Sequence, residues 1–167
     1  MRYRSKTLAT WLGIIAGALG AQRFYLHGAR DTLAWLHPAP TLVGLWGAWR
    51  MYTLGQDDRL SWLLVPILGV MLSISMLVAI VSALTPDASW DARYNPGLAP
   101  RQTRWGPVLG AIVALMIGGI VLMGTIAFAG QRYFEWRLEG AAVARTITTS
   151  SGPPSTPLRR RRPRLES

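Results

Sequence analysis

Apolar residues gather in long blocks along the chain instead of alternating with polar ones. Two blocks, Ser61 to Thr85 and Gly106 to Gly130, are each 25 residues long and contain no charged residue. As helices they would extend about 37 Å, which exceeds the roughly 30 Å hydrocarbon core of a bilayer. Tryptophans, whose rings favour the headgroup level, flank both blocks. The pattern predicts transmembrane helices over residues 61–85 and 106–130.

Two shorter apolar blocks precede them, at residues 7–21 and 32–49. The first can be completed as a span by Lys6, whose long side chain can reach outward to the interface. The second contains His37, Pro38 and Pro40, and a proline-broken helix can cross lipid when its neighbours satisfy the freed carbonyls. We expect His37 to bond such a carbonyl. Four spans are therefore expected, with a re-entrant or interfacial segment at the prolines as the alternative.

Composition agrees with an all-α integral membrane protein. Half of the 167 residues are hydrophobic and only 16% are charged. Four spans of about 20 residues would occupy roughly half of the chain, which leaves little for a soluble catalytic domain. Cysteine is absent from the sequence, so disulfides, thiolate metal sites and a cysteine nucleophile are excluded.

The distribution of Lys and Arg predicts the orientation of the four-span arrangement, because cytoplasmic connections carry an excess of both. With the amino terminus inside, the cytoplasmic segments near the spans carry eight such residues: Arg2, Arg4, Lys6, Arg50, Arg59, Arg132, Arg137 and Arg145. The outer connections carry five: Arg23, Arg30, Arg93, Arg101 and Arg104. Both termini are thus expected in the cytoplasm. In the alternative that the first 20 residues are a cleaved signal peptide, three spans remain and the carboxyl terminus stays inside.

The expected organisation has three parts. Residues 1–60 hold the first pair of spans, and residues 61–144 hold the second pair with a polar outer connection at 86–105 and a cytoplasmic helical extension at 131–144. That connection contains Trp90, Tyr94 and several charges, so it is either a small folded cap, which we favour, or a recognition surface. Residues 145–167 are rich in Pro, Ser, Thr and Arg and are expected to be disordered.

One motif resembles a known family. The run GALGAQRFYLHG follows the short first span, and its matching residues are Gly17, Gly20, Ala21, Arg23, Phe24, Tyr25 and Leu26, with Gly28 one residue late. Over about residues 5–60 the chain resembles the TM2 domain, although Gln22 stands where that family usually has His or Asp. The resemblance implies a two-helix membrane hairpin and implies little about activity. With no eukaryotic targeting signal recognised, it also suggests a bacterial inner membrane.

The sequence Arg23-Phe24-Tyr25-Leu26 is expected to form a loop that anchors the hairpin at the interface. Arg23 can reach lipid phosphates, Phe24 and Leu26 can enter the acyl boundary, and the hydroxyl of Tyr25 can stay hydrated. The alternative function of this loop is to bind a partner protein or a lipid headgroup.

Small residues recur at helical spacing in the first and last spans. They are Gly13, Gly17, Gly20, Gly110 and Gly118. Such positions let helices approach closely, and we expect them to pack within the molecule, with a homodimer contact as the alternative. At the other end of the chain, the basic tail Arg159, Arg160, Arg161, Arg162 and Arg164 suits anionic lipid, ahead of a protein partner and, last, nucleic acid.

Residues able to carry chemistry are few. Asp57 and Asp58 could bind a divalent ion, but their position before residue 61 favours capping of a helix. His27 and His37 lack zinc-site spacing, and we expect neither a metal nor a cofactor. The two long spans contain no ionisable residue, which disfavours proton-coupled transport. The expectation is a structural or accessory protein without catalytic activity, and the alternative is a small oligomeric channel or permease-like protein.

Overall fold

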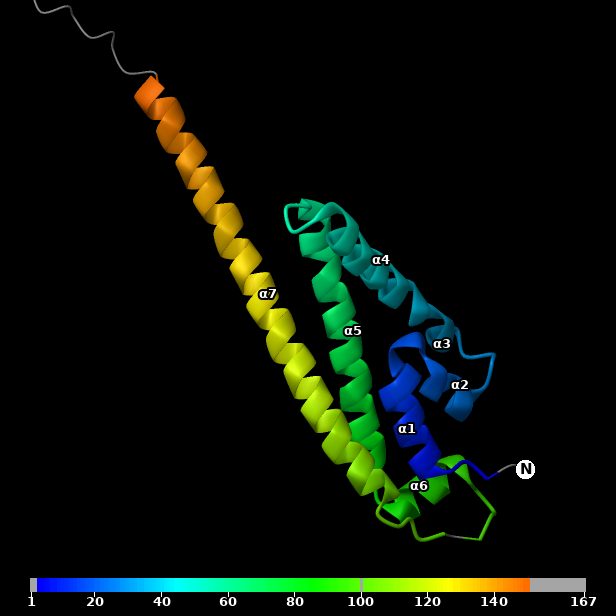
Figure 1. Cartoon of the computed structure of the whole chain (residues 1–167). Helices are drawn as coiled ribbons and strands as arrows, with labels where there is room; N and C mark the ends of the chain where they lie inside the picture. The colour runs from blue at the N-terminus through cyan, green and yellow to red at the C-terminus, as the bar shows by residue number, and fades with distance from the viewer. Residues whose placement is uncertain (1–2, 100, 151–167) are drawn as a thin grey trace, which may run out of the picture. The chain divides into compact units, whose positions relative to one another are not determined.

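The computed structural model describes residues 3–99 and 101–150, which form helices joined by short connections, with no strand in these ranges (Figure 1). The elements are α1 (Lys6–Ala16), the 3₁₀ turn η1 (Gly17–Leu19), α2 (Ala21–His27), α3 (Thr32–Leu36), α4 (Pro38–Leu54), α5 (Arg59–Leu84), α6 (Asp87–Tyr94) and α7 (Gly106–Ser150). The chain divides into two units, one ending at Arg132 and the other beginning at Tyr133, and each is described by itself. The all-helical fold class is as predicted.

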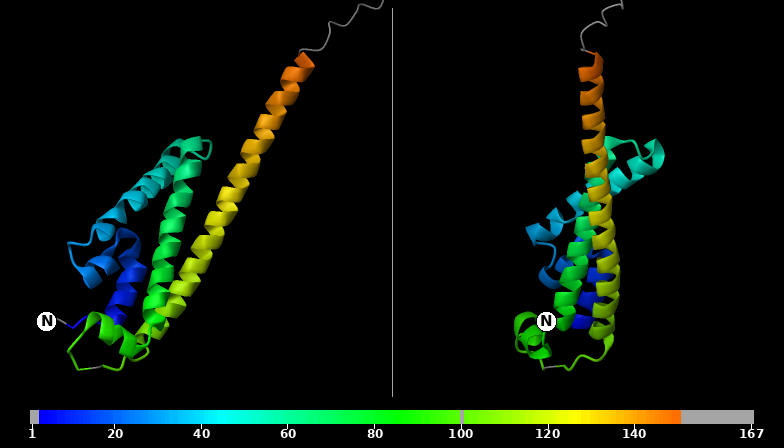
Figure 2. Two further views of the ribbon diagram at one scale, coloured as in Figure 1. Left: turned by 180° about the vertical axis from the view of Figure 1, so that it is seen from behind. Right: turned by 90° about the vertical axis from the view of Figure 1, so that its left-hand side faces the viewer.

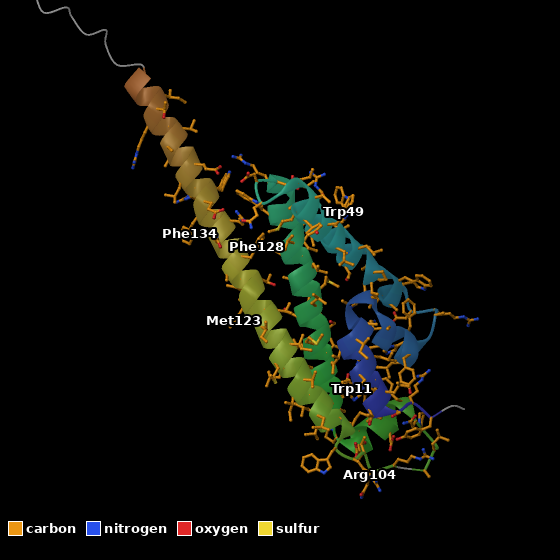
Figure 3. The ribbon with its side chains drawn as sticks, viewed as in Figure 1. Trp11, Trp49, Arg104, Met123, Phe128 and Phe134 are labelled. Atoms are coloured by element: carbon orange, nitrogen blue, oxygen red, sulfur yellow. The ribbon has the colours of Figure 1, made fainter. Side chains whose placement is uncertain are left out.

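Within the described residues, α5 and α7 are the two helices long and apolar enough to cross a membrane. They begin and end close to the predicted limits, except that α7 continues as far as Ser150. Both carry exposed apolar side chains: Leu77 on α5 is 59% exposed. Met123 on α7 is 65% exposed and points outward (Figure 3). A soluble core would bury such residues, so these surfaces suit lipid or neighbouring apolar helices.

The expected first span is not a continuous helix. α1 ends at Ala16, η1 follows, and Gly20 adopts a left-handed conformation with φ of 79° that starts α2. The chain then returns alongside α1, because the backbone N–H of Ser5 donates to the hydroxyl of Tyr25 at 2.8 Å. Residues 6–27 therefore form a short helical hairpin.

The turn of this hairpin lies about two-thirds of the way along α5 from its start. A Cβ added to Gly17 would meet the side chain of Ser75, nine residues before the end of α5 at Leu84. That distance corresponds to about 14 Å of helix. Thr41 of α4 donates to the carbonyl of Ala18 at 2.6 Å and so satisfies part of the irregular backbone of the turn. The prediction of a full first span is not confirmed, because the glycine-rich turn reverses the chain before α1 reaches the far end of α5.

The start of α1 and the end of α5 lie at the same end of the first unit, as the three views show (Figures 1 and 2). The ammonium of Lys6 forms an ion pair with the carboxylate of Asp87 and donates to the carbonyl of Thr85 at 3.0 Å. The four-span arrangement would have placed Lys6 and Asp87 on opposite sides of a bilayer. Their contact therefore gives that arrangement no support.

The proline-containing segment forms two helices, α3 and α4, which are separated at His37. The second of them, α4, packs antiparallel to α5. Nδ1 of His37 lies 2.8 Å from the carbonyl oxygen of Leu33, which agrees with the expectation that this ring bonds a backbone carbonyl. Pro38 is the first residue of α4, where the missing N–H costs no helical hydrogen bond. The break at His37 thus ends α3 and starts α4, and the chain continues past it without a reversal.

Glycines set the closest helix contacts of the first unit. A Cβ added to Gly44 of α4 would collide with Leu68 of α5, and one added to Gly47 would collide with Leu64. Among the glycines singled out by sequence, Gly13 faces Gln22 and Ala79, Gly17 faces Ser75, Gly20 faces the backbone of Ala34, Gly110 faces Thr10, and Gly118 faces Met76. These five positions all lie at contacts within the molecule.

The second unit contains the remaining part of α7. Tyr133 contacts Phe134 and Trp136 edge-on or tilted, and the guanidinium of Arg137 lies 5.8 Å from the centre of the Tyr133 ring. The predicted helical extension over 131–144 is present, whereas the expected disorder is wrong for residues 145–150, which continue the helix. The arginines at 159–162 and 164 lie outside the described residues.

Candidate functional site

The connection between α5 and α7 folds over the amino-terminal residues. Asn95 accepts from the backbone N–H of Arg4 at 2.8 Å and donates to its carbonyl at 3.2 Å, and Nε1 of Trp90 donates to the same carbonyl at 3.0 Å. The Trp90 ring is buried against Ala9 and Leu26. Of the two alternatives for this connection, the folded cap is the one that the structure contains.

Lys6 lies at the same end of the first unit as the cap and is buried, with only 8% of its surface exposed. Its partner Asp87 also accepts from the backbone N–H of Thr103 at 2.8 Å and from the Thr103 hydroxyl. Burial works against the charge on Asp87, but the hydrogen bonds from Lys6 and Thr103 outweigh it and lower the pKa of Asp87 to about 2. The carboxylate is therefore ionised over the whole ordinary pH range.

Asp91 is the second carboxylate of the cap. It accepts from the side-chain amide of Asn95 at 2.7 Å, from the backbone N–H of Arg101 at 3.1 Å and from the hydroxyl of Tyr3 at 3.2 Å. The Asn95 and Arg101 hydrogen bonds lower the pKa of Asp91, while burial and the nearby Asp91 charge raise the pKa of Tyr3. Both Asp87 and Asp91 are thus engaged in closing the cap over the amino terminus.

The Arg23-Phe24-Tyr25-Leu26 motif lies on α2 and is not a loop. Glycines with positive φ, Gly20 and Gly28, bound this helix. Arg23 pairs with Asp31 at 3.0 Å, and the Phe24 ring meets that of Trp35 edge-on. The paired glycines around an amphipathic seven-residue segment are the sequence signal that could have predicted a helix.

Two of the roles assigned to the motif are corrected. Leu26 is buried in the protein against Ala9 and Trp90, so it does not enter the acyl boundary. The hydroxyl of Tyr25 accepts the hydrogen bond from Ser5, so it holds the hairpin closed instead of pointing only into water. Gln22, which stands where the TM2 family usually has His or Asp, is 4% exposed, and its amide donates to the Ser82 hydroxyl of α5 at 2.6 Å.

A pocket of about 780 Å³ opens beside the cap and between α1, α2 and α6. Its lining consists of Tyr3, Arg4, Leu8, Phe24, Tyr25, Arg93, Tyr94 and Pro96. The lining contains two guanidinium groups, three phenol groups and no carboxylate. Sequence reasoning missed Arg4 and Arg93 as a pair, because they are 89 positions apart and come to line one pocket only when Asn95 bonds the backbone of Arg4.

A second pocket, of about 420 Å³, adjoins it at Arg93 and Tyr94 and extends along α5 to Leu77. Its polar rim includes Arg23 and His27, which both lie next to the carboxylate of Asp31. Burial opposes the charge on Asp31, but hydrogen bonds from Arg23 and the backbone of Leu33 lower its pKa. The basic groups of this second pocket are therefore partly neutralised by Asp31.

At the opposite end of the first unit, Asp58 precedes α5 at the expected capping position, but its side chain has another role. Its two carboxylate oxygens accept from Nε and an Nη of Arg50, each at 3.0 Å, and it also accepts from the Ser61 hydroxyl. These bonds lower the pKa of Asp58 well below its usual range, and the bond from Arg50 has the largest effect. Arg50 is held by this ion pair, and no side-chain cap to a backbone N–H is present at Asp58.

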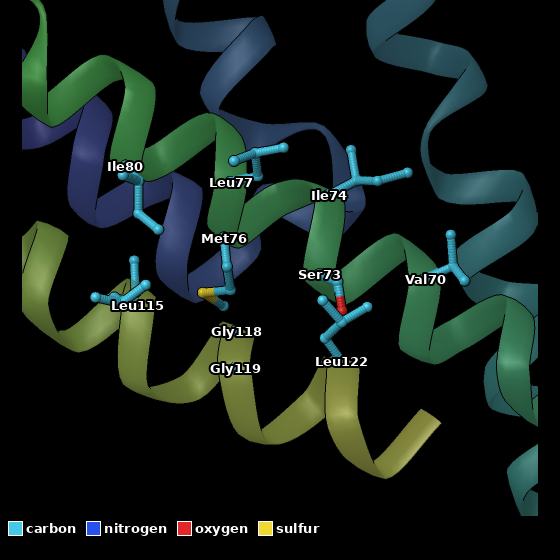
Figure 4. Close-up of a pocket in the computed structure, with 11 residues that line it drawn as sticks. Val70, Ser73, Ile74, Met76, Leu77, Ile80, Leu115, Gly118, Gly119 and Leu122 are labelled. Atoms are coloured by element: carbon cyan, nitrogen blue, oxygen red, sulfur yellow. The ribbon is translucent and has the colours of Figure 1, made fainter. Parts of the chain in front are cut away.

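An apolar groove of about 360 Å³ lies between α5 and α7 (Figure 4). Met76 reaches toward Gly118, and Ser73 faces Leu122. The hydroxyls of Ser73, Ser75 and Ser82 all donate to carbonyls of their own helix. Consequently these serines offer little free hydrogen-bonding capacity to a polar pathway.

The described part of the chain contains no group of three or more His, Cys, Asp or Glu residues placed to hold a metal ion. Comparison of the chain with protein-family models, curated proteins and solved structures gives no match. The resemblance of residues 5–60 to the TM2 domain therefore stays a prediction.

Proposed function

We propose that the protein is a multi-pass membrane protein of structural or accessory type, without catalytic activity, that crosses the bilayer three times. The proposed crossings are α3 with α4, then α5, then α7. The hairpin of α1 and α2 enters from one side and returns to it. The observation that carries this proposal is the Lys6–Asp87 ion pair beside the ends of two long apolar helices.

The position of the hairpin turn along α5 supports a segment that enters the bilayer part of the way and returns to the same side. Irregular backbone is tolerated within the hydrocarbon region only where protein covers it. Gly17, Ala18 and Gly20 are buried, and Thr41 bonds the carbonyl of Ala18. The turn thus has the protection that a re-entrant segment needs at mid-bilayer.

The revised arrangement also changes which basic residues share a side with the amino terminus. The amino-terminal side now carries Arg2, Arg4, Lys6, Arg23, Arg30, Arg93, Arg101 and Arg104. The other side carries Arg50, Arg59, Arg132, Arg137 and Arg145 near its spans. Because the first set is larger, the proposal places the amino terminus and the cap in the cytoplasm and the end of α7 outside. The arginines from 159 onward are too far from a span for the rule to count them.

A structural role follows from how the polar and apolar groups are used. The cap carboxylates, the α5 serines, Gln22 and Thr41 bond to other parts of the same molecule. The exposed apolar faces of α5 and α7 are the surfaces left for other membrane components. A channel, the alternative expected from the sequence, has less support, because the α5 serines already bond their own helix.

Site-specific photo-crosslinking in native membranes tests this function. A photoreactive residue at Leu115, which is 66% exposed, should join a distinct second protein in stoichiometric yield. The neighbouring position Ala114 is fully buried and serves as the matched control, which should give no such product. A product containing only this chain, together with ion or solute flux after reconstitution in liposomes, would support the channel and contradict the proposal.

A further inference from the structure

We propose that the pocket beside the cap binds the headgroup of an anionic phospholipid, with Arg4 and Arg93 contacting its phosphate. This site is the 780 Å³ pocket between α1, α2 and α6. Its volume lies within the roughly 300–1,000 Å³ that ligand pockets occupy. The inference rests on the proposed membrane insertion and adds a specific lipid to it.

The two arginines are free to bind an anion. The side chains of Arg4 and Arg93 take part in none of the ion pairs of the described residues, in contrast to Lys6 and Arg23. The backbone of Arg4 is fixed by Asn95 and Trp90, so its side chain starts from a defined position. Guanidinium groups bind phosphate oxygens through paired N–H donors, and the lining of this pocket contains two of them and no carboxylate. The nearby carboxylate of Asp91 lies behind the lining, where it accepts from the Tyr3 hydroxyl at 3.2 Å, so the lining itself favours a negative ligand.

Phenol groups complete the polar part of the pocket. The Tyr25 hydroxyl accepts from Ser5, which leaves its own hydrogen available to a ligand oxygen. Tyr94 lines the same pocket, and its ring lies 5.6 Å from the Arg93 guanidinium. These hydroxyls can donate to the phosphate or to the glycerol oxygens of a lipid.

The apolar part of the lining separates a lipid from a free phosphate ion. Leu8 is 48% exposed and faces the pocket together with Phe24. Both residues lie on the hairpin that the proposal inserts into the bilayer, next to the point where Ser5 and Tyr25 close it. A headgroup held by Arg4 and Arg93 would therefore have its acyl chains directed along an apolar surface. On the cytoplasmic side, where we place the cap, anionic lipids are enriched.

Native mass spectrometry of the full-length protein in mild detergent tests the site, with phosphatidylglycerol and phosphatidylcholine as probes. We expect one phosphatidylglycerol to bind in clear preference to phosphatidylcholine. The double variant R4Q/R93Q should weaken that binding by roughly thirtyfold, since each basic residue near an anionic headgroup contributes about fivefold. The variant R30Q/R104Q removes the same charge from the same end, outside this pocket, and should bind like the wild type.

Three results would overturn the site. Equal binding of the two lipids by the wild type would remove the selectivity, and this measurement needs no variant to fold. Equal weakening by R30Q/R104Q would assign the effect to diffuse charge. Displacement of phosphatidylglycerol by millimolar inorganic phosphate would reassign the pocket to a soluble anion. In each case a protein that still inserts into liposomes leaves the proposed membrane role intact, so the two failures are distinguishable.

Discussion

A lysine ammonium held away from water needs acceptors within the protein, and Lys6 finds them in the carboxylate of Asp87 and the carbonyl of Thr85. Both acceptors belong to the end of α5 and the start of α6. The free energy of this contact therefore favours the docking of the amino-terminal hairpin on the cap. A single side chain links segments that are about 80 positions apart in the sequence.

Replacing Asp87 by Leu should strand Lys6 without its charged partner. Because Asp87 is partly exposed, we expect a loss of about 2–3 kcal/mol in the free energy of unfolding, somewhat below the cost for a fully buried pair. The double variant K6M/D87L should recover at least half of that loss, since no unpaired cation then remains. Chemical denaturation in detergent measures both, and equal destabilisation by the single and double variants would contradict the assigned role of Lys6.

The same ion pair predicts a dependence on acid. The pKa of Asp87 is lowered to about 2, so its stabilising contribution is complete above the unfolded pKa of about 3.9 and is lost as the pH falls through 2. The difference in stability between wild type and D87L should shrink between pH 4 and pH 2, by on the order of 1 kcal/mol after allowance for partial exposure. Thermal unfolding at pH 7, 4 and 2 checks this, and a difference that stays constant over this range would refute it.

At the level of single residues, the sequence allowed some local roles to be predicted and not others. The bond of His37 to a backbone carbonyl was predictable, because adjacent prolines disturb the pattern of helical hydrogen bonds. The partners of Tyr25 and Leu26 were not, because they depend on α2 folding back onto α1 and under Trp90. Asp58 was correctly placed before α5, but its bidentate pair with Arg50 required the geometry of the α4–α5 connection.

Helix packing in the first unit depends on glycine at points of close approach. At Gly47 an added Cβ would collide with the Cβ of Leu64, whereas at Gly124 nothing lies within 4 Å of an added Cβ. We expect G47A to destabilise the protein by about 1–3 kcal/mol through overpacking, whereas G124A should be neutral or slightly stabilising. Unfolding curves of the two variants provide the comparison. Equal behaviour of G47A and G124A would show that α4 and α5 are not in this contact.

The sequence predicted α5 and α7 closely because the length of a charge-free apolar block is a local property. It did not predict the contact of Gly44 and Gly47 with α5, since their spacing of three residues differs from the small-residue pattern used for the other helices. The hairpin of α1 and α2 was missed for a related reason. Gly20 alone cannot reveal whether a helix continues across the bilayer or turns back.

For the whole molecule, the difference between the four crossings expected from the sequence and the three that we propose comes from the cap. Four hydrophobic blocks suggest four spans when each block is considered separately from the others. The bonds from Arg4 and Lys6 to residues 85–95 connect the first block to the third, and hydropathy contains no such information. In the proposed arrangement the grouping of basic residues changes as well, because Arg2, Arg4 and Lys6 share a side with the cap instead of with Arg50 and Arg59.

The absence of cysteine from the sequence makes the central claim directly measurable. A cysteine added at the amino terminus, and single cysteines replacing Arg30, Asp57 and Leu98 in turn, can be labelled with a membrane-impermeant maleimide in sealed vesicles of known orientation. We predict that the amino terminus, residue 30 and residue 98 react from the same side, the cytoplasmic one, and that residue 57 reacts only from the other. Labelling of the amino terminus on the side of residue 57, opposite residue 98, would contradict the three-crossing arrangement and restore the four-span one.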